Sequence, residues 1–185
     1  MKRVVWLLCF VLLLGGCTSG DDSMDKVLAL RSKLLAQGAE FDGVIVADFS
    51  DRTYTFCVHC VVDVQGKVTF RVTEPSSIAG ITGTVSAGGG KLTFDDQALA
   101  FPNLADGQLS PVSAPWVLMN TLRSGYLTSA GMESGVVRVA IDDSYADNAL
   151  HLDIWLDENE LPARCEIIWK GRRVLSMEVK NFRFV

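Results

Sequence analysis

The sequence predicts a mainly β domain in which a curved antiparallel sheet packs against two or three helices. From residue 43 onward, apolar and polar residues alternate with a period of two, and β-branched and aromatic residues are frequent. Short turn sequences separate these segments, and such short links connect only antiparallel neighbours. Two longer stretches, near 22–37 and 113–125, follow the helical period instead.

The first 17 residues resemble the signal of a bacterial lipoprotein. The basic pair Lys2 and Arg3 precedes an apolar stretch, Val4–Leu14, which is much shorter than the roughly 20 residues of a spanning helix. The sequence Leu13-Leu14-Gly15-Gly16-Cys17 then matches a lipobox, with acylation expected at Cys17. The chain is therefore predicted to have three parts: a signal peptide at 1–16, a lipidated tether at 17–21 and one domain at 22–185.

Composition restricts the partners of this domain. The net charge of the 185-residue chain is −5, and removal of Lys2 and Arg3 with the signal peptide brings it nearer to −7. Basic residues are scattered, so a nucleic-acid partner is not expected. The predicted membrane contact is the lipid anchor, on the extracytoplasmic face of the cell membrane. Because Thr18 rather than Asp follows Cys17, the outer membrane is the expected location if the organism has two membranes.

The first predicted helix starts at Asp22 or Ser23 and ends before Gly38. Its apolar residues are expected on one stripe. Such a stripe can bind a membrane, but the apolar face of a domain's first helix usually packs on the sheet that follows. The stripe consists of Met24, Val27, Leu28, Leu34 and Leu35.

The alternating segments predict a meander of strands, interrupted by a second helix. Ser113 is the expected cap of that helix, Pro115 lies in its first turn, and Gly125 ends it. Trp116, Met119 and Leu122 are expected on one face of it, and a shorter helical turn is expected at 76–80. The predicted strands are 43–50, 53–63, 67–74, 81–87, 91–95, 98–101, 126–131, 135–142, 149–157, 161–169 and 173–184.

Each strand has one strongly apolar face. In 54–62, for example, Tyr54 and every second residue after it are apolar. A large sheet with a single apolar face must curve so that this face is covered, and the enclosed interior is then either filled by side chains or partly hollow. A hollow interior would be lined by Phe56, Val58, Phe70, Val72, Leu152 and Ile154 from strands, and by Trp116 and Met119 from the second helix.

The motif Cys57-Val58-His59-Cys60 has the spacing of a redox pair, but it lies inside a predicted strand. Positions three apart in a strand point to opposite faces, about 10 Å apart, whereas a disulfide needs about 4.4–6.8 Å between Cα atoms. Cys57 and His59 share a face and offer two zinc ligands, but a site needs three or four. We expect Cys60 to be a small buried residue, near Cys165.

Catalytic patterns are not found elsewhere in the sequence. His59 and His151 have no nucleophilic serine motif beside them, and the adjacent aspartates at 95–96 and 142–143 are typical of turns. The glycines at 88–90 precede a strand and not a helix, so they do not form a phosphate loop. We predict no catalytic residue, no metal site and no cofactor.

Several segments together carry a resemblance to a known family: Cys17, the first helix up to Phe41-Asp42-Gly43, 73–81, 109–126, 161–167 and 171–182. With these segments the chain resembles the lipoprotein-carrier superfamily with the LolA/LolB/RseB-like fold, and more closely the membrane-anchored LolA-like lipoproteins of Gram-positive bacteria. The resemblance implies a half-open antiparallel barrel covered by helices, with an apolar concavity that holds acyl chains in the carriers.

Two functions follow as hypotheses. The first is a non-catalytic, membrane-anchored binding module for an apolar ligand, either the acyl chain of a lipid or a lipoprotein. The second is an envelope interaction or signalling protein that regulates a membrane partner through its surface, without a bound lipid. An open cavity would favour the first, and a filled interior the second. A thiol or metal enzyme at residues 57–60 is excluded if a strand runs through them.

Overall fold

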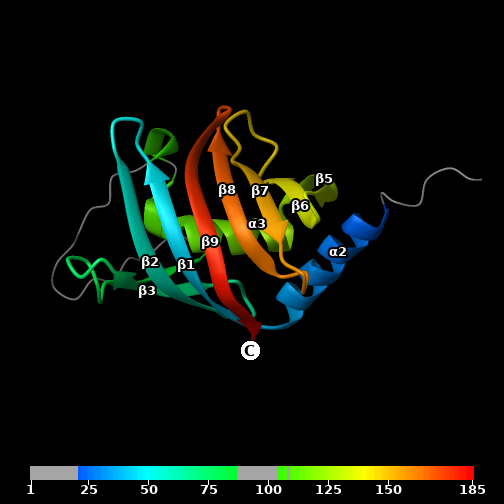
Figure 1. Cartoon of the computed structure of the whole chain (residues 1–185), viewed down its shortest axis with the longest axis horizontal. Helices are drawn as coiled ribbons and strands as arrows, with labels where there is room; N and C mark the ends of the chain where they lie inside the picture. Colours follow the sequence, from blue (N-terminus) through cyan, green and yellow to red (C-terminus); the bar gives the residue numbers. More distant parts are fainter. Residues whose placement is uncertain (1–20, 87–103, 108) are drawn as a thin grey trace, which may run out of the picture.

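The computed structural model describes residues 21–86, 104–107 and 109–185, which form one nine-stranded antiparallel sheet with two α-helices (Figure 1). The strands are β1 (Ala39–Asp48), β2 (Thr53–Val62), β3 (Val68–Glu74), β4 (Thr82–Val85), β5 (Tyr126–Glu133), β6 (Val136–Asp142), β7 (His151–Leu156), β8 (Pro162–Trp169) and β9 (Arg172–Phe184). The helices are α2 (Asp21–Ala36) and α3 (Ala114–Ser124), with 3₁₀ turns at Ala105–Gly107 and Pro111–Ser113.

The strand order is β4-β3-β2-β1-β9-β8-β7-β6-β5, and the sheet does not close into a barrel. The prediction of a mainly β, antiparallel and open architecture is therefore confirmed. The sequence predicts a meander interrupted by a second helix, and the structure instead arranges the strands before and after that helix as two meanders, β1–β4 and β5–β9. They join where the first and last strands pair, with Gly43 opposite Val179 and Ile45 opposite Met177.

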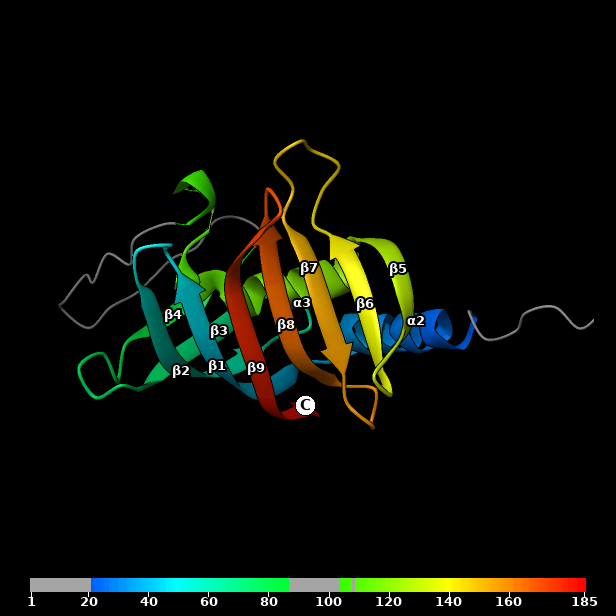
Figure 2. The same cartoon turned by 45° about the horizontal axis from the view of Figure 1, so that its top comes forward.

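Both helices lie on the same side of the sheet, which we call the inner face (Figures 1 and 2). Alternate residues of the strands point to this face and form one apolar core with α2 and α3. Phe41, Ile45, Phe70 and Ile154 are at most 1% exposed. Burial of each such side chain stabilises the fold by about 1.5–3 kcal/mol relative to exposure. The opposite side of the sheet, which we call the outer face, is the more polar one.

Helix α2 packs on the core with a narrower set of residues than its sequence predicts. Val27, Leu30 and Leu34 are buried, whereas Leu28 and Leu35 are 45% and 53% exposed. The predicted stripe is thus wrong at these two leucines, because α2 meets the core along one line of the helix and its neighbouring residues remain outside. Among the described residues, no helix is long and apolar enough to span a membrane.

Gly38 lies in the two-residue link between the end of α2 and the start of β1. A Cβ atom at this position would lie 2.7 Å from the Val62 carbonyl oxygen, so the end of β2 approaches too closely for any other residue. The helix therefore ends at Ala36 and the strand begins at Ala39, four residues earlier than predicted. The early start of β1 puts Phe41 into the core.

Several smaller predictions can also be compared with the structure. Tyr54 is exposed at the start of β2, although the alternation places it on the apolar side. The segment 76–80 forms turns and not a helical turn. The strands predicted at 91–95 and 98–101 lie outside the described residues. Ser113 precedes α3 as predicted, but its hydroxyl donates to the Ser110 carbonyl and does not cap the helix.

Candidate apolar site on the inner face

The structure brings the eight predicted lining residues into one apolar cluster on the inner face. Val58 and Val72 are direct cross-strand partners, and Phe70 lies opposite Cys60. The lining residues come from three strands and α3: Phe56 and Val58 from β2, Phe70 and Val72 from β3, Leu152 and Ile154 from β7, and Trp116 and Met119 from α3.

Seven of these eight residues are shielded from water, with exposed fractions of 2% or less. The exception is Trp116, which is partly exposed in the first turns of α3. A ligand therefore cannot reach the strand residues unless α3 or its neighbours move. Whether the eight residues line a cavity stays a prediction.

Helix α3 crosses the inner face behind β9 and β8 (Figure 1). Its buried side includes Val117, Leu118, Met119 and Leu122, so it is broader than the predicted face. Gly125 follows the helix with an extended backbone, and a Cβ atom there would lie 2.6 Å from Ile141 Cγ2. Glycine is required here for space, because the chain passes directly against β6.

Two arginines fix the C-terminal end of α3. Arg31 of α2 donates to the carbonyls of Leu122 (2.7 Å) and Gly125 (3.0 Å). Arg123 donates to the carbonyl of Leu34 and, at 2.8 Å, to that of Val64. The carbonyls of Leu122 and Gly125 at the end of α3, and that of Leu34 at the end of α2, thereby gain donors that a helix end does not supply, and cations are favourable there. The Val64 carbonyl lies in the β2–β3 turn. Burial lowers the pKa of Arg31 from its ordinary value.

The N-terminal end of α3 is held differently. Pro115 occupies the first turn, as predicted, and no side chain caps the helix. Apolar contacts of Pro111, Val112 and Ala114 hold this end, since all three are buried. The two ends therefore differ. Hydrogen bonds to α2 and the β2–β3 turn fix one end, whereas the described residues of the other end are held by packing and by local hydrogen bonds such as that from Ser113 to Ser110.

The cysteine motif lies in β2, as predicted. Cys57 points to the outer face, whereas Cys60 is fully buried on the inner face, and all three described cysteines are free thiols. Burial raises the pKa of Cys60 and of Cys165 above the ordinary value, and burial followed by the nearby Glu74 raises that of Cys57. The strand through the motif excludes a redox pair, which confirms the sequence interpretation.

Each histidine lies opposite an aspartate on the neighbouring strand. His59 Nδ1 is 2.9 Å from Asp42 Oδ1, and His151 Nδ1 is 2.6 Å from Asp142 Oδ1. Hydrogen bonds from Asn181 and then His59 lower the pKa of Asp42. Sequence reasoning missed both pairs, because they depend on strand register. The described residues contain no group of His, Cys, Asp and Glu suited to a metal ion.

A second polar cluster lies on the outer face around Trp155. Arg138 donates to Asp153 at 2.6 Å, and its guanidinium carbon lies 5.7 Å from the Trp155 ring centre. Arg164 lies over the same ring at 4.5 Å. The Trp155 indole N–H donates to Glu133. Most polar atoms of these side chains pair with one another, whereas the buried Arg138 Nε has no hydrogen-bond partner and lies 3.8 Å from a Glu133 carboxylate oxygen.

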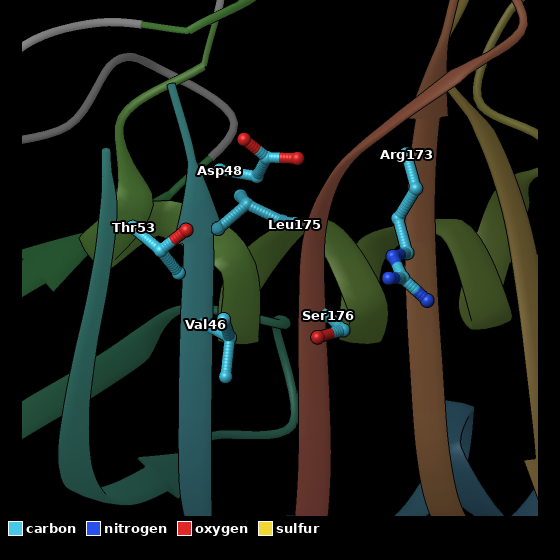
Figure 3. Close-up of a pocket in the computed structure, with 6 residues that line it drawn as sticks. All are labelled: Val46, Asp48, Thr53, Arg173, Leu175 and Ser176. Carbon is cyan, nitrogen blue, oxygen red and sulfur yellow. The ribbon is translucent and has the colours of Figure 1, made fainter. Parts of the chain in front are cut away.

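A small pocket also opens on the outer face, between β1, β2 and β9 (Figure 3). Its volume of about 110 Å³ is well below the roughly 300–1,000 Å³ of typical ligand sites. None of the predicted lining residues contributes to it. The pocket is lined by Val46, Asp48, Thr53, Arg173, Leu175 and Ser176.

No family model and no curated protein matches this sequence. Three solved structures illustrate what its fold is similar to. An uncharacterized conserved protein from Thermus thermophilus has 11% identity and a TM-score of 0.47 over 88% of each chain. A LolA-superfamily protein from Nitrosomonas europaea has 9% identity and a TM-score of 0.39, with 86% of this chain and 93% of that chain covered.

The third structure is the MucA/MucB complex from Pseudomonas aeruginosa. Its matching chain has 18% identity and a TM-score of 0.40, and the match covers 88% of this chain and 57% of that one. At these identities the likeness is one of fold alone.

Proposed function

We propose that this chain is a non-catalytic binding module, anchored to the bacterial envelope through an acylated Cys17, that binds an acyl chain between the inner face of its sheet and α3. The observation that carries the proposal is the continuous apolar inner face of an open sheet, crossed by a helix whose C-terminal end, among the described residues, is the one that arginine hydrogen bonds join to α2 and the β2–β3 turn. The anchored form is that of the Gram-positive LolA-like lipoproteins that the sequence resembles.

The energetics of an acyl chain suit such a face. Burial of each methylene contributes about 0.8 kcal/mol, so a chain of roughly 14–16 carbons can offset the cost of displacing α3 and still bind. Because the described interior is closed, the ligand must occupy space that opens when the N-terminal end of α3 moves. Trp116 lies at this end and is partly exposed, so it is the proposed entrance residue.

The binding step can be tested by titrating the mature chain with a fluorescent fatty acid. Trp116→Arg places a charge at the proposed entrance, and the fold should tolerate it because Trp116 already contacts water. Tyr145→Arg, in the exposed β6–β7 loop, is the matched control. We expect Trp116→Arg to weaken binding at least tenfold and the control to bind like the original. Equal binding by both variants contradicts an entrance at α3.

The anchor can be tested separately. Cys17→Ala should abolish incorporation of labelled palmitate and release the chain from the membrane fraction. Cys9→Ala, which changes a cysteine within the predicted signal peptide, is the control and should leave both unchanged. Palmitate incorporation that persists in Cys17→Ala contradicts lipidation at this residue.

The exclusion of water from seven of the eight lining residues favours a second candidate function, a regulator that binds a membrane partner through its surface. This function needs no cavity. The fatty-acid titration distinguishes the two candidates, because a surface regulator with a filled interior takes up no acyl chain.

A further inference from the structure

Helix α2 carries apolar side chains that the core does not use. Leu28 and Leu35 are 45% and 53% exposed, although the buried residues beside them pack tightly on the sheet. The two leucines are seven residues apart, about two helical turns, so they project from the same side of the helix. Met24 precedes Leu28 by four residues on that side and is half-buried. We call these three residues the α2 flank.

The basic side chains of α2 are either engaged with other groups or lie on another side of the helix. Lys26 pairs with Asp22 at 3.1 Å and Glu160 at 3.8 Å, beside the β7–β8 turn. Arg31 lies next to the flank, but its guanidinium is engaged with the carbonyls at the end of α3. Lys33 lies about 140–160° around the helix from the two leucines. The flank is therefore an apolar strip without a free cation, bordered on one side by the exposed Asp25.

The length of the tether restricts where this strip can be. Three residues lie between Cys17 and Asp21, which makes four steps along the chain, and an extended chain spans at most about 3.6 Å per step, so the helix begins within roughly 14 Å of an acylated Cys17. Leu28 lies only about 10 Å further along the helix. The strip thus lies within reach of the bilayer that holds the anchor.

The position of α2 in the molecule agrees with this restriction. The helix begins at the end of the molecule that carries β5 and the β5–β6 hairpin (Figures 1 and 2). That hairpin exposes Met132 (61%) and Val136 (37%). Single exposed leucines are common on soluble proteins. Here they occur on the helix that follows the tether directly, and more exposed apolar residues lie at the same end.

We infer that the α2 flank lies in the interfacial region of the bilayer, so that α2 runs along the membrane and the domain has a fixed orientation on it. The inference rests on the proposed acylation of Cys17. Two leucines bind a bilayer only weakly, but the anchor makes the contact intramolecular, and the high effective concentration compensates for the weak affinity.

The test uses the full acylated lipoprotein, reconstituted in phosphatidylcholine vesicles. A single cysteine is introduced as Ser32→Cys, next to the leucines, or as Lys33→Cys, at the same height but on the opposite side; both positions are exposed. Cys57→Ser is included in both variants so that the fluorophore reacts only with the new cysteine. The two other described thiols, Cys60 and Cys165, are buried and need no substitution. An environment-sensitive fluorophore on the new cysteine is then quenched by phosphatidylcholine with a shallow nitroxide.

We expect at least twofold quenching of the label at residue 32 and none at residue 33. The further change Leu28→Gln with Leu35→Gln should remove the quenching at 32, while flotation shows the chain still on the vesicles. Equal quenching at 32 and 33, or none at 32 on chains that float, overturns this inference alone. Chains that lack the acyl group and fail to float overturn the proposed anchor and this inference together.

Discussion

At the scale of single residues, alternation along a strand predicted where Cys57 and Cys60 point, and the structure agrees. Alternation fixes the face of a residue but not its partner on the next strand. The pairs His59–Asp42 and His151–Asp142 therefore escaped the sequence, although each joins residues directly opposite one another. Register depends on how the whole sheet assembles, so it could not be derived from the segments separately.

The Asp42 carboxylate gives a prediction about pH. Hydrogen bonds from Asn181 and His59 hold its pKa below the ordinary 3.8, so its contribution to stability is complete above that value and is lost as the pH falls through the lower, folded pKa. Because Asp42 is half-exposed, the contribution is at most about 1 kcal/mol. Urea denaturation at pH 7 should show Asp42→Asn to be less stable than the original chain, and at pH 2.5 this difference should be smaller.

Asp147→Asn is the control for this measurement, because Asp147 is exposed in the β6–β7 loop. A stability difference for Asp42→Asn that is the same at both pH values would show that the carboxylate has no special role.

Gly125 gives a prediction about packing. An added Cβ would meet Ile141 Cγ2 at 2.6 Å and the Thr121 carbonyl oxygen at 2.7 Å, so Gly125→Ala must shift the end of α3 or β6. We expect a loss of about 1–3 kcal/mol in the free energy of unfolding, measured with urea. Gly131→Ala in β5 is the matched control, since nothing lies within 4 Å of its Cβ. Equal stability of the two variants would show that the end of α3 adapts freely.

At the scale of elements, the sequence predicted both helices and the described strands to within a few residues, because their periodicities differ clearly. Faces of helices were predicted less well. Leu28 and Leu35 belong to the apolar stripe of α2 in sequence, yet they remain exposed because the sheet and α3 accept only one line of that helix. The sequence allows the apolar stripe of α2 either to pack on the core or to bind a membrane. In the structure, Val27 and Leu34 of this stripe are buried in the core, whereas Leu28 and Leu35 form the exposed flank.

The fixed end of α3 gives a prediction at this scale. Arg31→Met keeps most of the apolar stem but leaves the carbonyls of Leu122 and Gly125 without their donor. An unpaired, partly buried carbonyl costs about 1–3 kcal/mol, so the last turn of α3 should exchange its amide hydrogens faster. Mass-spectrometric hydrogen exchange measures this. Lys33→Met on the exposed side of α2 should leave the exchange unchanged. A similar acceleration in both variants would show that the hydrogen bonds of Arg31 do not fix the end of α3.

At the scale of the whole molecule, the open antiparallel sheet with its helical cover agrees with the sequence prediction, whereas the arrangement of its strands as two meanders was not predicted. The pairing of β1 with β9 joins residues at opposite ends of the domain, such as Ala39 and Phe184. Short turns specify neighbours along the chain but carry no information on which distant strands meet. The sequence does not distinguish a hollow from a filled interior, and the structure shows the interior closed around seven of the eight lining residues.

The central proposal is an acyl chain between α3 and the inner face, and native mass spectrometry tests it most directly. The full lipoprotein is released from host membranes in a mild detergent, and its mass is compared with that of the covalently acylated chain alone. The proposal predicts an additional, non-covalent lipid mass that extraction removes and that is lost in Trp116→Arg but retained in Tyr145→Arg. A chain that carries only its covalent acyl groups, and takes up no added fatty acid, would contradict the proposal and favour a regulator that acts through its surface.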